Sequence, residues 1–321
     1  MGSQMFDSIR DRLEGCFYTI FTPFAQNYAI DYEALENYLS TLYSHGARRF
    51  YAMAYNSRYS QLSNAEIMDL NRFCIEFLKR IDTKNIVIVG DPIHCSTNES
   101  VEFAKHAREC GADLISLIVR EKYFSDEQIL DHFSAVASSS NMAILIHEMP
   151  FLSGYDGTQM HWPASLLKAL PKIPEVVALK EDAKNFEITK TALELEPDIR
   201  VIIAGTKASL LRYKPYGAKA YLNGISMIDA RIGEEFWKAY NSNDEEVINI
   251  ILKKIEAPFF EKCVGKFGWH RTNKALLQAA GMMHRRDRMP LKHLSEPEYN
   301  IVRDVFIEIN RSWSEYLSGR H

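Results

Sequence analysis

Short apolar runs alternate with longer segments of helical period along most of the chain, beginning at Gly15. The short runs are rich in β-branched residues, a pattern typical of parallel strands joined by crossover helices. Eight runs are expected to be strands, at residues 16–21, 49–54, 85–90, 113–119, 141–147, 176–180, 200–204 and 220–222. Each is followed by an expected helix, at residues 32–44, 64–78, 96–110, 127–138, 163–170, 185–195, 208–216 and 232–240.

Eight strand-then-helix units within about 230 residues predict an α/β fold, a (β/α)8 TIM barrel. An open doubly wound sheet usually has five or six strands and often a glycine-rich first turn, and no G-x-G-x-x-G motif follows these strands. After Asn241 only helices are expected, at 244–264, 272–280 and 297–317. We therefore expect an N-terminal tail at 1–14, the barrel at 15–241 and a C-terminal helical extension at 242–321, packed on the barrel.

Composition narrows the class of protein. Hydrophobic residues make up 46% and charged residues 25% of the 321 residues, as in ordinary soluble globular proteins. Lys and Arg number 38 against 42 Asp and Glu, so the net charge of −4 does not favour nucleic acid or an anionic membrane as a partner. No apolar stretch reaches about 18 residues and the start lacks the apolar core of a signal peptide, which predicts a cytoplasmic protein.

Neither the cysteines nor the known metal and nucleotide motifs indicate a bound metal or cofactor. The five cysteines are odd in number and include no C-x-x-C pair, so neither a disulfide framework nor a zinc site is indicated. The chain has no H-E-x-x-H motif and no Walker-type loop. We expect no metal and no cofactor, and a small molecule as the ligand.

In a barrel of this kind, reacting groups come from the carboxyl ends of the strands. Lys180 ends the otherwise apolar run EVVALK, so its side chain is expected to project from a buried strand. Desolvation would lower the pKa of this ammonium group and produce neutral amine, which can attack a carbonyl and form a Schiff base. The residues alone leave open a second interpretation, in which Lys180 simply pairs with Glu181, Asp182 or Glu148.

Several stretches together resemble a known family. They are GCFYTIFTPF near the start, VIVGDPIHCSTNESVEFAKHARECGAD, VVALKED around Lys180, IIAG ending at Gly205, and Lys274 with Arg288, Pro290 and Leu291 near the end. In this order they resemble the pyruvate-dependent class I aldolases typified by dihydrodipicolinate synthase and N-acetylneuraminate lyase, over roughly residues 15–309. The resemblance implies a divergent member of that family, with Lys180 on the sixth strand as the catalytic Schiff-base lysine.

The first departure from the family follows the second strand. Family members usually have Gly-Thr-Thr-Gly-Glu there, which holds the substrate carboxylate, whereas this chain has Tyr55, Asn56, Ser57 and Arg58. The loss of both glycines removes the close backbone approach to a ligand. The resemblance places Asn56, Ser57 and Arg58 in the substrate-binding position, where Arg58 could grip an acid group with its guanidinium. The alternative is that Arg58 forms a surface or interdomain salt bridge.

The second departure ends the fifth strand, where the family has Tyr-Asn-x-Pro and this chain has HEMP at 147–150. The family tyrosine relays protons to and from the imine. His147 can act as the acid and base near neutral pH, or it can be a hydrogen-bonded wall residue. Tyr55, on the loop after the second strand, is the rival candidate for the missing phenol.

The resemblance also assigns three further substrate-binding residues. Tyr123 corresponds to a tyrosine after the fourth strand that enters the neighbouring subunit's site, although interface packing is an equal alternative. Gly205 follows the seventh strand, and Asn223 lies near the family's Gly-x-Ile-Ser turn after the eighth.

These assignments predict a Schiff-base-forming lyase, aldolase or dehydratase that acts on a 2-oxo acid or a related carbonyl compound, as a homodimer or homotetramer. The alternative is a non-catalytic binding or partner subunit, which keeps the barrel but has lost the carboxylate cradle and the proton relay.

Overall fold

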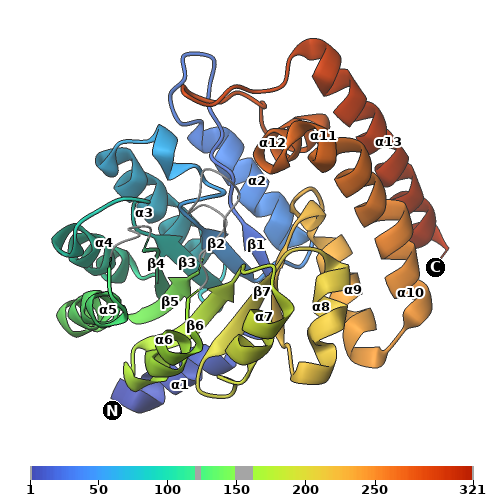
Figure 1. Ribbon diagram of the computed structural model, residues 1–321. Helices are drawn as coiled ribbons and strands as arrows, with labels where there is room; N and C mark the ends of the chain where they lie inside the picture. The colour runs from blue at the N-terminus through green and yellow to red at the C-terminus, as the bar shows by residue number, and fades with distance from the viewer. Residues whose placement is uncertain (1, 120–123, 149–161, 320–321) are drawn as a thin grey trace. The chain divides into compact units, whose positions relative to one another are not determined.

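The computed structural model describes residues 2–119, 124–148 and 162–319 (Figure 1). In these residues eight strands form a closed parallel barrel in which neighbours in sequence are neighbours in space. The strands are β1 Gly15–Thr19, β2 Arg49–Ala52, β3 Ile86–Gly90, β4 Leu114–Leu117, β5 Ala143–His147, β6 Val176–Glu181, β7 Arg200–Ala204 and β8 Ala220–Asn223. The expected (β/α)8 barrel is therefore confirmed, with strand ends that differ from expectation by a few residues at most.

The helices between the strands begin where the sequence supplies capping residues. Ser63, Ser96 and Ser125 each form a capping box with a Glu or Gln three residues later, and α3, α4 and α5 start directly after them. The helices are α1 Gly2–Asp11, α2 Tyr32–Ser44, α3 Asn64–Ile81, α4 Thr97–Cys110, α5 Asp126–Ser140, α6 Ala164–Ala169, α7 Phe186–Leu193, α8 Lys207–Tyr213, α9 Ala230–Ser242, α10 Glu245–Ile250, α11 Gly265–Phe267, α12 Trp269–Ala279 and α13 Glu296–Ser318. Two π-helical segments, η6 Ile251–Glu256 and η7 Phe259–Val264, follow α10, where the sequence predicts a single helix. No helix in the described ranges is long and apolar enough to span a membrane.

The chain forms two compact units. The first consists of Met1–Thr19, Arg48–Gly205 and Ser209–Leu222, and contains the barrel strands up to Leu222. The second consists of Ile20–Ala47, Thr206–Ala208 and Asn223–His321. The division expected from the sequence, a barrel at 15–241 and a packed extension at 242–321, stays a prediction.

The barrel core is built from alternate residues of the strands. Side chains two apart on one strand share a face, so one set from each strand points inward. The buried cluster contains Ile86 and Ile88 of β3, Ala143 and Leu145 of β5, and Ala178 of β6. Helix α1 contacts β6 and adds Phe6 to this cluster, where the sequence predicts only a tail, because α1 carries apolar residues on one face.

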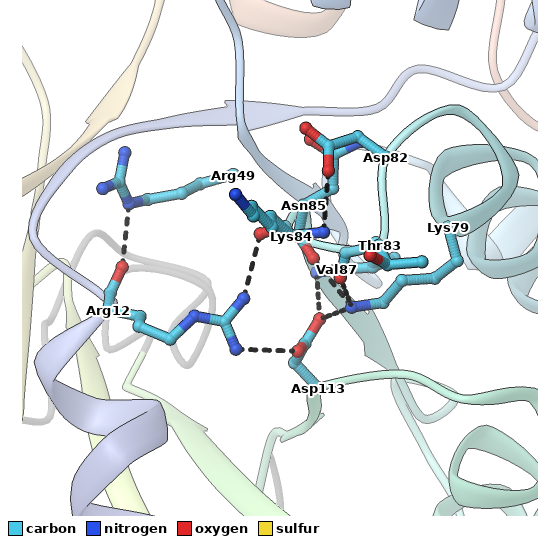
Figure 2. Close-up of polar contacts among 9 residues, drawn as sticks. All are labelled: Arg12, Arg49, Lys79, Asp82, Thr83, Lys84, Asn85, Val87 and Asp113. Carbon is cyan, nitrogen blue, oxygen red and sulfur yellow. Dashed lines mark hydrogen bonds and ion pairs between the residues drawn. The ribbon is translucent and has the colours of Figure 1, made fainter.

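The amino ends of β2, β3 and β4 are tied together by charges (Figure 2). The Asp113 carboxylate accepts hydrogen bonds from Lys79 Nζ at 2.7 Å and from the Val87 amide at 2.8 Å. Arg12 lies 3.7 Å from the same carboxylate, and its main-chain carbonyl accepts a bond from Arg49 Nε at 3.0 Å. These contacts stabilise the amino-terminal end of the barrel, whereas the reacting groups of such barrels lie at the opposite end.

Candidate active site

The strand pattern places Lys180 and His147 inside the barrel. Lys180 lies two residues after Ala178 and His147 two after Leu145, and both earlier residues belong to the core cluster, so both polar side chains face inward. The parallel register pairs His147 directly with Lys180. Each is 1% exposed, and Lys180 Nζ lies 2.8 Å from His147 Nε2. Two of the three residues predicted to be catalytic, Lys180 and His147, are therefore in direct contact.

Asp182 is the second partner of Lys180. Lys180 Nζ donates to Asp182 Oδ2 at 2.9 Å, and Lys184 Nζ lies 2.5 Å from Asp182 Oδ1. Burial lowers the pKa of Lys180, while the negative charge of Asp182 and its hydrogen bond oppose that change. Lys180 is thus buried with a lowered pKa and also paired with a carboxylate, and its catalytic role stays a prediction.

The other two carboxylates named as possible partners of Lys180 are Glu181 and Glu148, and no hydrogen bond joins either to the Lys180 amine among the contacts described. Glu181 alternates with Lys180, and its side chain accepts bonds from Thr189 Oγ1 at 2.8 Å and from the Ala183 amide at 2.6 Å. Glu148 likewise alternates with His147. Burial, with the nearby charges of Glu181 and Asp182, raises the pKa of Glu148 to about 8.

Tyr51 and Ser116 line the same interior, and neither was predicted from the sequence to be a site residue. Tyr51 of β2 is fully buried, and its ring meets the His147 ring edge-on with centroids 6.5 Å apart. Its hydroxyl lies 2.5 Å from Ser116 Oγ of β4, and burial raises its pKa well above the ordinary value. The signal in the sequence was the strand alternation, since Ser116 lies two residues after the core residue Leu114.

The loop after β2 contains three residues that the resemblance places in the substrate-binding position, Asn56, Ser57 and Arg58. Asn56 is buried and donates through Nδ2 to Thr19 Oγ1 at 3.0 Å, and Ser57 is also buried. Arg58 has the left-handed φ of 54° and lies with its guanidinium carbon 4.1 Å from the centre of the Tyr55 ring. Tyr55 itself is partly buried and packs against the core cluster.

Arg58 and Tyr55 also line a cavity of about 360 Å³. Other residues of its wall are Leu62, Ile67, Pro92 and His94, from the start of α3 and the loop after β3. Arg58 therefore lines this cavity, whereas Lys180 contacts His147 and Asp182.

The remaining predicted substrate-binding residues lie at strand ends or outside the described residues. Gly205 follows β7 with a φ of 127°, a backbone conformation that residues with a Cβ rarely adopt. Asn223 is the last residue of β8 and is buried. Tyr123 lies outside the described residues. In the parts of the chain that the structure describes, no three His, Cys, Asp or Glu side chains are grouped as metal ligands.

Comparison with known proteins gives relatives of nearly the same length. The 4-hydroxy-tetrahydrodipicolinate synthase of Archaeoglobus fulgidus is 23% identical over 295 residues, covering 91% of this chain and 96% of that protein. The same-named protein of Brachyspira hyodysenteriae is 24% identical over 301 residues, covering 91% and 96%.

Solved structures show the same fold at low identity. YagE, a prophage protein from Escherichia coli K12 solved in complex with pyruvate, superposes with a TM-score of 0.80 at 17% identity, covering 92% of this chain and 98% of that one. The dihydrodipicolinate synthase of Aquifex aeolicus gives a TM-score of 0.79 at 22% identity, covering 92% and 98%. The model of the dihydrodipicolinate synthetase family matches residues 12–308, and the chain therefore belongs to this family of lyases.

Proposed function

We propose that this protein is a lysine-dependent lyase, an aldolase or dehydratase, that forms a Schiff base between Lys180 and a 2-oxo acid or a related carbonyl compound. One observation carries the proposal: Lys180 Nζ is buried inside the barrel, 2.8 Å from the imidazole Nε2 of His147. A nucleophile and a base in hydrogen-bond contact are what this chemistry requires.

The proposed steps assign each atom a role. His147 Nε2 first takes one proton from the Lys180 ammonium group, and the neutral Nζ then adds to the carbonyl carbon. His147 carries protons from the nitrogen to the former carbonyl oxygen, which leaves as water with two of the three original ammonium protons, and the third stays on the imine nitrogen. The protonated imine then withdraws electrons from the neighbouring carbon, so that a bond to that carbon can break or form. His147 thus takes the relay role of the family tyrosine, and Tyr55 remains the rival for it.

Comparison with the other buried lysines shows what distinguishes Lys180. Lys274 is fully buried and burial lowers its pKa to about 8, but its Nζ donates to the Thr22 carbonyl at 2.7 Å. Lys207 is buried next to Glu256, 3.5 Å from its carboxylate. All three lysines are buried, but of the three only Lys180 has a described contact with an imidazole.

Hydride trapping tests the proposal. The protein is incubated with cyanoborohydride and a panel of 2-oxo acids and aldehydes, followed by intact mass measurement and peptide mapping. We expect one adduct, on Lys180, that is absent from Lys180→Met, with Lys274 unlabelled as the internal control. An unmodified Lys180 across a panel that labels another family member would overturn the proposal. Thermal stabilisation by a carbonyl compound without any adduct would favour the non-catalytic binding subunit.

A homodimer or homotetramer remains the prediction for the assembly.

A further inference from the structure

Asp182 is built into the site at the atom where the imine would form. It lies two residues after Lys180, directly after the end of β6 at Glu181, and it is 6% exposed. One carboxylate oxygen accepts from Lys180 Nζ at 2.9 Å, and the other lies 2.5 Å from Nζ of the half-exposed Lys184. A charge contact that is shielded from water in this way is weakly screened.

The nitrogen of Lys180 carries a positive charge both in the ammonium form and in the protonated imine. Counted from the ammonium form of Lys180, which first passes a proton to His147, the reaction forms an N–C bond, and the carbonyl oxygen leaves as water with two of the three ammonium protons. The third proton stays on the imine nitrogen, which keeps the positive charge. Asp182, already 2.9 Å from that nitrogen, is placed to stabilise the protonated imine over the neutral one.

A 2-oxo acid would bring a second anion to the same nitrogen, because its carboxylate is attached to the imine carbon. A neutral ketone or aldehyde brings none and depends on the protein for a counter-ion. Two of the three groups that the resemblance assigned to the acid end of the substrate contact other side chains, since Arg58 stacks on Tyr55 and Asn56 donates to Thr19.

We infer that Asp182 is the internal counter-ion of the imine on Lys180, and that the site accepts carbonyl substrates without a carboxylate next to the carbonyl group, namely neutral ketones or aldehydes. This inference rests on the proposed function. It narrows the proposed substrates from 2-oxo acids and related carbonyl compounds to carbonyl compounds that carry no negative charge.

Pyruvate and pyruvamide form a matched pair of probes, because they have nearly the same shape and differ by one negative charge. The rate of hydride-fixed adduct on Lys180 is measured with each, and the ratio of the pyruvamide rate to the pyruvate rate is compared among variants. Asp182→Asn should lower this ratio about 10-fold or more, because pyruvate supplies its own anion and pyruvamide does not. Lys184→Gln should raise it, because Asp182 loses a competing cation.

Glu187→Gln is the control, since it removes one negative charge from an exposed position on α7 and should leave the ratio unchanged. Adduct with pyruvate but none with pyruvamide would overturn the inference and leave the proposed function standing, as would an equal ratio in Asp182→Asn and Glu187→Gln. If Asp182→Asn does not fold, an unchanged ratio in Lys184→Gln overturns the inference. No adduct with either compound, nor with the wider panel of 2-oxo acids and aldehydes, overturns the proposed function itself.

Discussion

Replacing Lys274 by Met tests whether burial alone depresses a lysine pKa in this protein, which is the premise applied to Lys180. Lys274 of α12 is fully buried, with Nζ 2.7 Å from the Thr22 carbonyl oxygen, 3.9 Å from Met283 Sδ and 5.4 Å from the centre of the Phe24 ring. Burial lowers its pKa to about 8, against the partly compensating charge of Asp287.

The sign and size of the effect follow from proton linkage. Between pH 8 and the ordinary value of 10.5, the unfolded chain binds a proton at Lys274 that the folded protein does not hold, so stability rises with pH across this window. The gap between the two values corresponds to about 3 kcal/mol of unfolding free energy. Lys274→Met cannot show this rise. Its loss of the bond to Thr22 costs about 1–3 kcal/mol at every pH and cancels when two pH values are compared.

Chemical denaturation of wild type and Lys274→Met at several pH values from 7 to 10.5 measures the difference. We expect the variant to lose most of about 3 kcal/mol relative to wild type as the pH rises through this range. Lys253→Met, at an exposed position, is the matched control and should follow wild type. Parallel profiles for wild type and Lys274→Met would refute the reasoning and remove the premise that burial activates Lys180.

Three further predictions concern the catalytic contact, a buried carboxyl group and a close approach. His147→Gln should slow adduct formation at Lys180 about 100-fold or more, because an amide forms a hydrogen bond but does not carry the proton; an unchanged trapping rate would exclude His147 as the relay. Burial raises the pKa of Asp91 from 3.8 to about 7, so the folded state holds an extra proton in that window and stability falls as the pH rises through it. Asp91→Asn should lack this fall, of which about 3 kcal/mol lies between pH 5 and pH 8, and equal pH dependence of both proteins in denaturation at these two pH values would contradict it. Gly224→Ala would bring a Cβ to 2.9 Å from Trp269 Cη2, so we expect about 1–3 kcal/mol of destabilisation and altered tryptophan fluorescence, and unchanged stability would mean that the ring moves aside freely.

Much of the barrel was predictable because its signal is local. Each strand is a short apolar run bounded by polar residues, and each helix carries its own period and caps, so eight units could be counted from the chain alone. Lys180 stood out for the same reason, as a charge that ends an apolar strand. The helix α1 was missed because a short amphipathic segment has little intrinsic helical preference and forms on packing, here with Phe6 in the barrel core.

The site was predictable only in part. The contact between Lys180 and His147 agrees with their expected places at the ends of neighbouring strands, and Asp182 was named as one of three possible partners of Lys180. The contact of Asp182 with Lys180 could have been argued from their spacing of two residues. The position of Arg58 could not, because it depends on a left-handed φ of 54° that turns the side chain onto Tyr55.

The sequence by itself determined the fold class, the strand that carries the lysine and the residue types at its end, because strand period and apolar burial are properties of neighbouring residues. Only the tertiary structure decided which groups meet. Tyr51, Ser116, His147 and Lys180 come from four different strands, and their contacts depend on the register between strands that closure of the barrel imposes. That register made Lys180 a buried amine held between an imidazole and a carboxylate.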